Sequence, residues 1–194
     1  MITQPALTPE REANKPWLVV IDPQVIFADP QSDWCASGFE ATVPVVESLL
    51  PHFKGRTVVT RWLPPATHKG SWREYFQTWK FADRPADDSY FDLVPVAHSW
   101  STRDTVDVTT FGKWPALEAI TGSHPNLVLA GVATDCCVIT TALAAADSGA
   151  YVTVISDACA GSTTENHDKA LSLMELFAPQ IRVVSSGEYL SEVG

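Results

Sequence analysis

The chain alternates between short apolar runs and stretches with helical spacing, and this alternation restricts its fold more than any other feature. Continuous apolar runs of the kind found in buried parallel strands occupy residues 17–21, 56–62, 104–108, 126–132, 151–156 and 180–184. Helix-compatible apolar spacing fills residues 39–52, 114–121, 137–148 and 164–177. Strands that alternate with helices predict a three-layer α/β/α fold around one mainly parallel, six-stranded sheet.

Length and composition indicate a single globular domain. A chain of 194 residues can bury a substantial core without disulfides or metals, and a hydrophobic content of 45% with 19% charged residues is typical of globular proteins. Residues 1–15 are polar, without the apolar segment of a signal peptide, and we interpret them as a loose arm before a domain at 16–194. Residues 63–100 break the alternation with Pro and aromatic residues, which predicts a lid or a contact surface.

Charge and cysteine content exclude several classes of function. A net charge of −10 repels nucleic acids and anionic membranes, and no apolar run reaches the roughly 20 residues that span a bilayer. The four cysteines include an adjacent pair, which suits a disulfide framework poorly, so we expect a reduced, cytoplasmic protein. The sequence has neither a C-x-x-C nor an H-E-x-x-H motif, and we expect no metal and no other cofactor.

A pair of cysteines follows the fourth apolar run, at the predicted start of a helix. The N–H groups of a first helical turn and the positive end of the helix dipole favour a thiolate, which is the nucleophilic form of cysteine. Cys137 lies in that turn if Thr134 or Asp135 caps the helix, so we predict that Cys137 rather than Cys136 is a nucleophile. The alternative is that both are small buried apolar residues.

Polar side chains at other strand ends could join this cysteine, because ligands bind beyond the C-terminal ends of parallel strands. Asp22 follows five apolar residues, where burial would suit it to proton transfer, although a turn-capping Asp is the alternative. Lys113 follows the weak third strand, where a solvated lysine is the alternative.

Aromatic residues near the strand ends could wall a dry pocket for a small planar substrate, although core packing would explain them equally well. Arg61 could bind a substrate carboxylate or pair with an acidic residue of the chain. The predicted substrate-binding residues are Phe27, Trp34, Arg61, Trp62 and Trp114.

Over most of its length the chain resembles the isochorismatase-like cysteine hydrolases, which include nicotinamidases, N-carbamoylsarcosine amidases and ureidoacrylate hydrolases. The likeness rests on VVIDPQ at residues 19–24 and on the specific block GVATDCCV at 131–138. It continues through TALAAADSG at 141–149 and VTVISDACAG at 152–161. The resemblance implies the Rossmann-like fold of that family.

The resemblance also implies a role for each site residue. The cysteine before the valine, Cys137, would be the nucleophile, and Asp22 would take its proton and return it to the leaving amine. The backbone N–H groups of Ala133 and Cys137 would hold the oxyanion, and the peptide between Val132 and Ala133 would be cis.

Two features depart from the family pattern. The family lysine would fall at Val108, so Lys113 can replace it only if its side chain reaches back over the site. Nicotinamidases carry a metal-binding Asp-x-His segment after the second strand, but residues 61–65 provide neither ligand here, and His68 alone cannot build that site. A metal-dependent nicotinamidase is therefore disfavoured.

These features predict a metal-free cysteine hydrolase that cleaves a small amide, carbamoyl or ureido compound through an acyl-enzyme on Cys137. Two alternatives stay open: a vinyl ether hydrolase of the isochorismate type, and a non-catalytic binding or scaffold protein with the same fold. We rate a redox role for the adjacent cysteines lower, because their disulfide would be strained. The expected partners are a small-molecule substrate and, as in the family, further copies of the chain in a dimer or tetramer.

Overall fold

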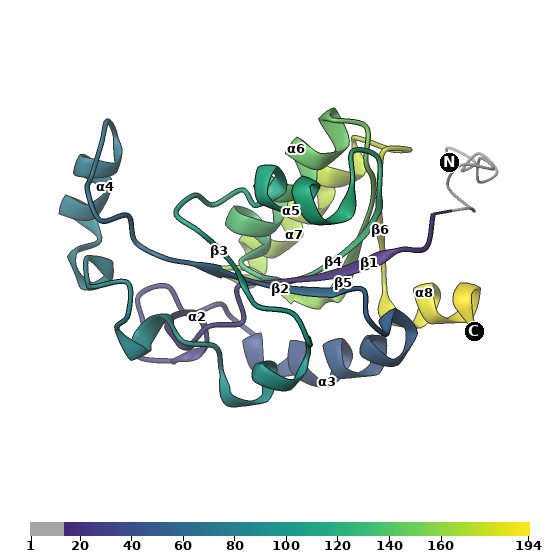
Figure 1. Cartoon of the computed structure of the whole chain (residues 1–194), viewed down its shortest axis with the longest axis horizontal. Coiled ribbons are helices and arrows are strands. Elements are labelled where there is room, and N and C mark those ends of the chain that lie inside the picture. Colours follow the sequence, from purple (N-terminus) through teal and green to yellow (C-terminus); the bar gives the residue numbers. More distant parts are fainter. Residues whose placement is uncertain (1–13) are drawn as a thin grey trace.

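The predicted α/β/α architecture is confirmed by a computed structural model, which describes residues 14–194 (Figure 1). All but the last two residues of the arm predicted at 1–15 lie outside the described part. One six-stranded sheet has the order β3-β2-β1-β4-β5-β6, and every neighbouring pair is parallel. Its strands are β1 (Trp17–Ile21), β2 (Thr57–Trp62), β3 (Val106–Val108), β4 (Asn126–Val132), β5 (Tyr151–Ala160) and β6 (Ile181–Val184).

Helices cover both faces of this sheet (Figure 1). One face packs against α5 (Trp114–Thr121), α6 (Ile139–Asp147) and α7 (Thr164–Glu175). The other packs against α3 (Phe39–Leu49), its 3-10 extension Leu50–Phe53, and α8 (Ser186–Val193). Alternate residues of β1 divide between the two cores, with Val19 in the first and Val20 in the second, so both faces of the central strand are buried. None of the helices within residues 14–194 is long and apolar enough to cross a membrane.

The central strands β1 and β4 approach each other closely near their C-terminal ends. Gly131 pairs with Ile21 and has a φ of +105°. A Cβ on Gly131 would lie 2.1 Å from the backbone oxygen of Ile21, so only glycine fits this position.

Residues 63–100 form a largely irregular segment, as predicted, with short helices inside it. These are α4 (Trp72–Thr78) and the 3-10 helices Lys80–Ala82, Ser89–Phe91 and Pro95–Ser99. Gln24 connects this segment to the sheet through side-chain hydrogen bonds. It lies just before the short helix α2 (Val25–Ala28). Its Nε2 donates to the carbonyl oxygens of Trp62 at 3.0 Å and Phe91 at 2.7 Å, and its Oε1 accepts from the Trp62 N–H at 2.8 Å. This fully buried amide joins the end of β2 to the irregular segment.

Candidate active site

Asp22 lies at the C-terminal end of β1 and is fully buried. Its φ of +49° turns the chain sharply after the strand, in a region that Asp tolerates better than most residues. Thr60 of β2 holds the side chain in place, because its hydroxyl donates to Asp22 Oδ1 at 2.7 Å and accepts from the Asp22 N–H at 3.2 Å. The sequence analysis missed Thr60, which looks like an ordinary β-branched strand residue.

Lys113 forms a buried ion pair with Asp22. Its Nζ lies 2.7 Å from Asp22 Oδ2, and both side chains are 0% exposed. Nζ also donates to the carbonyl oxygen of Thr110 at 3.3 Å. Burial lowers the pKa of Lys113, but the Asp22 carboxylate and the charges of Cys137 and Cys136 together outweigh burial, and the pKa is raised overall. Lys113 therefore reaches back into the site, as the resemblance required, and the solvated alternative is wrong.

The ion pair lies beside the turn that carries the two cysteines. This turn is a π-helix, Thr134–Val138, which leads into α6 and follows a cis peptide between Val132 and Ala133, as the resemblance implied. Thr141 of α6 connects the turn to the lysine: its hydroxyl donates to the carbonyl oxygen of Cys137 at 2.6 Å and accepts from the Lys113 N–H at 3.0 Å. Asp22, Lys113 and Cys137 are therefore brought together, as predicted.

The ionisation of Cys137 differs from the expectation for a helix start. A hydrogen bond with Cys136, complete burial and the charge of Asp22 together raise the pKa of Cys137 well above its ordinary value, although Lys113 acts in the opposite direction. The same thiol–thiol hydrogen bond lowers the pKa of the half-buried Cys136. Burial and the neighbouring groups therefore oppose the thiolate that the helix start was expected to favour at Cys137.

Two hydrogen-bonded contacts fix the cysteine turn to the segment after β5. The Asp135 carboxylate accepts from the Ser162 N–H at 2.8 Å and from its hydroxyl at 2.6 Å. The hydroxyl of the buried Thr134 pairs with His167 Nδ1 at 2.8 Å. His167 therefore supports the turn beside the oxyanion position expected at Ala133.

Aromatic side chains cluster around Trp34 next to the turn. The Trp34 ring is half-buried, and five rings surround it with centroids 5.2–6.2 Å away: Phe27, Trp62, Tyr75, Trp79 and Phe81. We call these six residues the Trp34 cluster. Cys136 and Ala133 pack in the same apolar group as Trp34 and Phe27, so the cluster adjoins the cysteine turn. Tyr75, Trp79 and Phe81 come from the irregular segment, and no sequence pattern tied them to the site.

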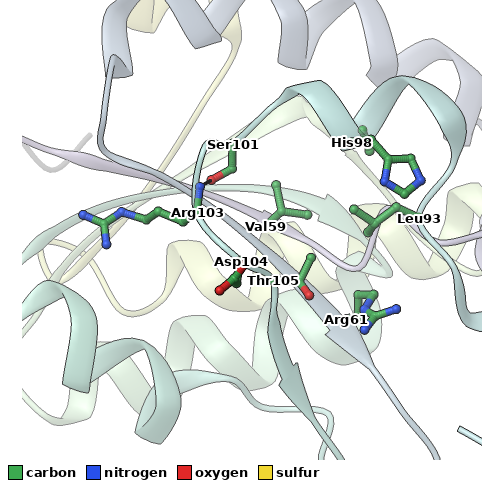
Figure 2. A pocket seen from close by; sticks show the side chains of 9 residues that line it. Val59, Arg61, Leu93, His98, Ser101, Arg103, Asp104 and Thr105 are labelled. Atoms are coloured by element: carbon green, nitrogen blue, oxygen red, sulfur yellow. Dashed lines mark hydrogen bonds between the residues drawn. The ribbon is translucent and has the colours of Figure 1, made fainter. Parts of the chain in front are cut away.

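The other predicted substrate-binding residues lie elsewhere or are fully packed. Arg61 forms a two-pronged ion pair with Asp107, with distances of 2.9 and 2.6 Å. It lines a pocket of about 310 Å³ against β2, and that pocket is lined by neither Asp22, Lys113 nor Cys137 (Figure 2). The structure therefore agrees with the alternative that Arg61 pairs with an acidic residue of the chain. Trp62 and Trp114 are buried core residues, with exposed fractions of 0% and 4%.

Metal-ligating side chains do not gather within residues 14–194, where no group of three or more His, Cys, Asp or Glu is placed to hold an ion. His68, the one histidine near the end of β2, stacks on Phe76 at 4.2 Å and lies 3.2 Å from the Asp83 carboxylate.

Comparisons with known proteins agree with this architecture. An isochorismatase family protein from Desulfovibrio vulgaris is 22% identical, with a TM-score of 0.76 over 93% of this chain and 98% of that one. A cysteine hydrolase from Pseudomonas syringae pv. phaseolicola is 15% identical, with a TM-score of 0.76 over 92% of each chain. A pyrazinamidase of Pyrococcus horikoshii, solved in complex with zinc, is 23% identical, with a TM-score of 0.66 over 88% of this chain and 99% of that one.

No curated protein matches the sequence. The model of the isochorismatase domain, however, matches residues 16–185, which is nearly the whole described chain. Together with the fold, this match shows that the chain belongs to the isochorismatase family.

Proposed function

We propose that the protein is a cysteine hydrolase that cleaves the C–N bond of a small amide, carbamoyl or ureido compound without a metal ion. The observation that carries this proposal is the buried Asp22–Lys113 ion pair, which lies within electrostatic range of the Cys137 thiol. A carboxylate beside a buried thiol is the arrangement that an acid–base-assisted nucleophile needs. Membership of the isochorismatase family and the likeness to a cysteine hydrolase support this reading.

In the first step Asp22 takes the proton of Cys137 as the sulfur attacks the carbonyl carbon. Apart from its ion pair, Asp22 Oδ2 has no hydrogen-bond donor within residues 14–194, which leaves an oxygen lone pair for that proton. Because the pKa of Cys137 is raised, the thiol stays protonated until the substrate binds. Lys113 holds the Asp22 carboxylate in place through their ion pair.

The tetrahedral intermediate then collapses. Its oxyanion would be held by the backbone N–H groups of Ala133 and Cys137. Asp22 returns the proton to the leaving nitrogen, the C–N bond breaks, and the acyl or carbamoyl group stays on the sulfur. Water hydrolyses this thioester, releases the acid and restores the thiol.

Release of ammonia from benzamide, phenylurea and N-carbamoylglycine tests the proposal. We expect turnover of at least one of these compounds, its loss in Cys137→Ala, and most of it to persist in Cys136→Ala. The opposite pattern would make Cys136 the nucleophile. Activity that survives both substitutions would favour chemistry without a cysteine nucleophile, as in the vinyl ether alternative, and a wild-type protein inactive on all three would favour a binding protein.

A further inference from the structure

Thr140 and Thr141 are adjacent in α6, and both direct their hydroxyl groups back to the cysteine turn. The Thr140 hydroxyl donates to the carbonyl oxygen of Cys136 at 2.6 Å, and the Thr141 hydroxyl donates to that of Cys137 at 2.6 Å. Each bond reaches back four residues along the chain, as threonine hydroxyls within helices can do. The two side chains differ in their surroundings, because Thr140 is exposed and Thr141 is 0% exposed.

Thr141 also contacts the residue that carries the buried ammonium group. Its hydroxyl oxygen accepts from the backbone N–H of Lys113 at 3.0 Å, across 28 residues of sequence. A hydroxyl has one proton to donate and two lone pairs that accept, so a single oxygen can serve both contacts. Lys113 is the N-cap residue of α5, and the N–H groups at a helix start have no partner within the helix. Thr141 therefore joins the start of α5 to the turn that holds Cys137.

The loop of residues 109–112 leads into Lys113 and has hydrogen bonds of its own. The Thr110 hydroxyl donates to the carbonyl oxygen of Gly112 at 2.8 Å, and Lys113 Nζ donates to that of Thr110 at 3.3 Å. These two bonds maintain the shape of the loop but do not connect it to α6, whereas the backbone contact of Lys113 does. The Lys113 side chain runs from this loop to the Asp22 carboxylate, so a displaced backbone would move the ammonium group away from its partner.

We propose, on the basis of the function above, that Thr141 is a positioning residue whose hydroxyl holds the backbones of Lys113 and Cys137 in a fixed arrangement. The reaction depends on this arrangement because the proton moves between the Cys137 sulfur and Asp22, and Lys113 holds Asp22 in place. A displacement of about 1 Å in such a site can lower a rate about a hundredfold. Thr141 is fully buried, so it acts through these neighbours rather than on the substrate.

Substitutions that separate the hydroxyl of Thr141 from its shape test this proposal. Thr141→Val keeps the shape and removes the hydroxyl, whereas Thr141→Ser keeps the hydroxyl and removes a buried methyl group. We expect Thr141→Val to slow the alkylation of Cys137 by iodoacetamide at pH 7 about tenfold, and Thr141→Ser to retain most of the rate. Thr140→Val is the matched control and should leave the rate unchanged. Its hydroxyl bonds to the carbonyl oxygens of Cys136 and Cys137, but within residues 14–194 it has no hydrogen bond to Lys113.

Two further measurements separate positioning from a general loss of structure. The midpoint of the pH profile of Cys137 alkylation should rise in Thr141→Val, because the charge of Lys113 lowers the pKa of that thiol and would be displaced. For a compound that is turned over in the ammonia assay, kcat should fall about tenfold while KM changes little. Labelling of the buried Cys159 reveals an unfolded variant. If Thr141→Val unfolds, Thr141→Ala replaces it, because alanine places no additional apolar group against the two backbone partners.

Equal Cys137 rates and pH midpoints in folded Thr141→Val and wild type would overturn the role of Thr141 and leave the proposed function intact. A loss in Thr141→Ser or Thr140→Val as large as that in Thr141→Val would also overturn it, because packing or the bond to the cysteine turn would then account for the effect. A Cys137 that iodoacetamide does not label in the wild type would instead overturn the proposed nucleophile, and the role of Thr141 with it.

Discussion

Replacement of Asp22 by asparagine tests the buried ion pair while almost preserving its shape. The amide oxygen can still accept from Thr60, but Lys113 loses its counter-charge inside the protein. Removal of one partner of a buried pair leaves an uncompensated charge and costs about 3–5 kcal/mol. Domains of this kind have a free energy of unfolding of about 5–15 kcal/mol, so Asp22→Asn should lose a large part of its stability.

The pH dependence of this loss follows from Lys113. Its pKa in the native wild-type protein is raised above the ordinary 10.5, so the stabilisation is complete below pH 10.5 and disappears as pH rises through the native pKa. In Asp22→Asn, burial acts without the carboxylate and lowers the pKa of Lys113, so the unfolded chain binds the proton more tightly. The difference in stability between the two proteins should therefore be largest near neutral pH and shrink above about pH 10.

Urea denaturation followed by tryptophan fluorescence measures this difference. Asp107→Asn is the control, because it breaks the Arg61 pair, whose side chains are 24% and 34% exposed, and should cost at most about 1 kcal/mol. A loss below about 1 kcal/mol in Asp22→Asn at pH 7, or a loss that does not change with pH, would refute the argument that a charged, buried Lys113 depends on Asp22.

Three further substitutions probe the frame of the site. Gly131→Ala should abolish soluble expression, because its Cβ would lie 2.1 Å from a backbone oxygen of β1. Gly122 is the control: it also has a positive φ, but a Cβ there would meet no atom within 4 Å. Gly122→Ala should therefore lower the free energy of unfolding, measured by urea denaturation, by only about 1–2 kcal/mol. Thr60→Val keeps the shape of the side chain but removes the donor to Asp22, and should lower kcat about tenfold with a smaller change in KM. Ser185→Ala removes the capping box of α8 and should lower the free energy of unfolding by about 1 kcal/mol without affecting the rate of Cys137 alkylation.

Local pattern was sufficient for the sheet but not for every element. Apolar runs located all six strands, because strands buried on both faces leave continuous hydrophobic segments. The fifth strand continues to Ala160, four residues beyond its predicted end. The prediction stopped earlier because polar residues interrupt the apolar run there. Helix α8 was missed although Ser185 and Glu188 form a capping box, since it is short and its apolar positions are few.

The site shows the same division between local and spatial information. Asp22 and Cys137 were predicted because strand ends and helix starts can be found in sequence. Lys113 was proposed with the help of a family resemblance, and only the structure shows that its side chain reaches Asp22. Thr60 carries no local signal, because its role arises from its hydrogen bond to Asp22, 38 residues away in the sequence. Tyr75 joins the Trp34 cluster only through the path of the irregular segment, which sequence patterns do not predict.

The rate of Cys137 alkylation by iodoacetamide at pH 7, compared between wild type and Asp22→Asn, tests the central claim most directly. Labelling of the buried Cys159 serves as a check that the variant remains folded. If Asp22 acted only through its charge, which raises the pKa of Cys137, its removal would ease ionisation and accelerate labelling. If Asp22 takes the thiol proton during attack, its removal slows labelling. The account predicts slower labelling of Cys137 in folded Asp22→Asn, and faster labelling would contradict it.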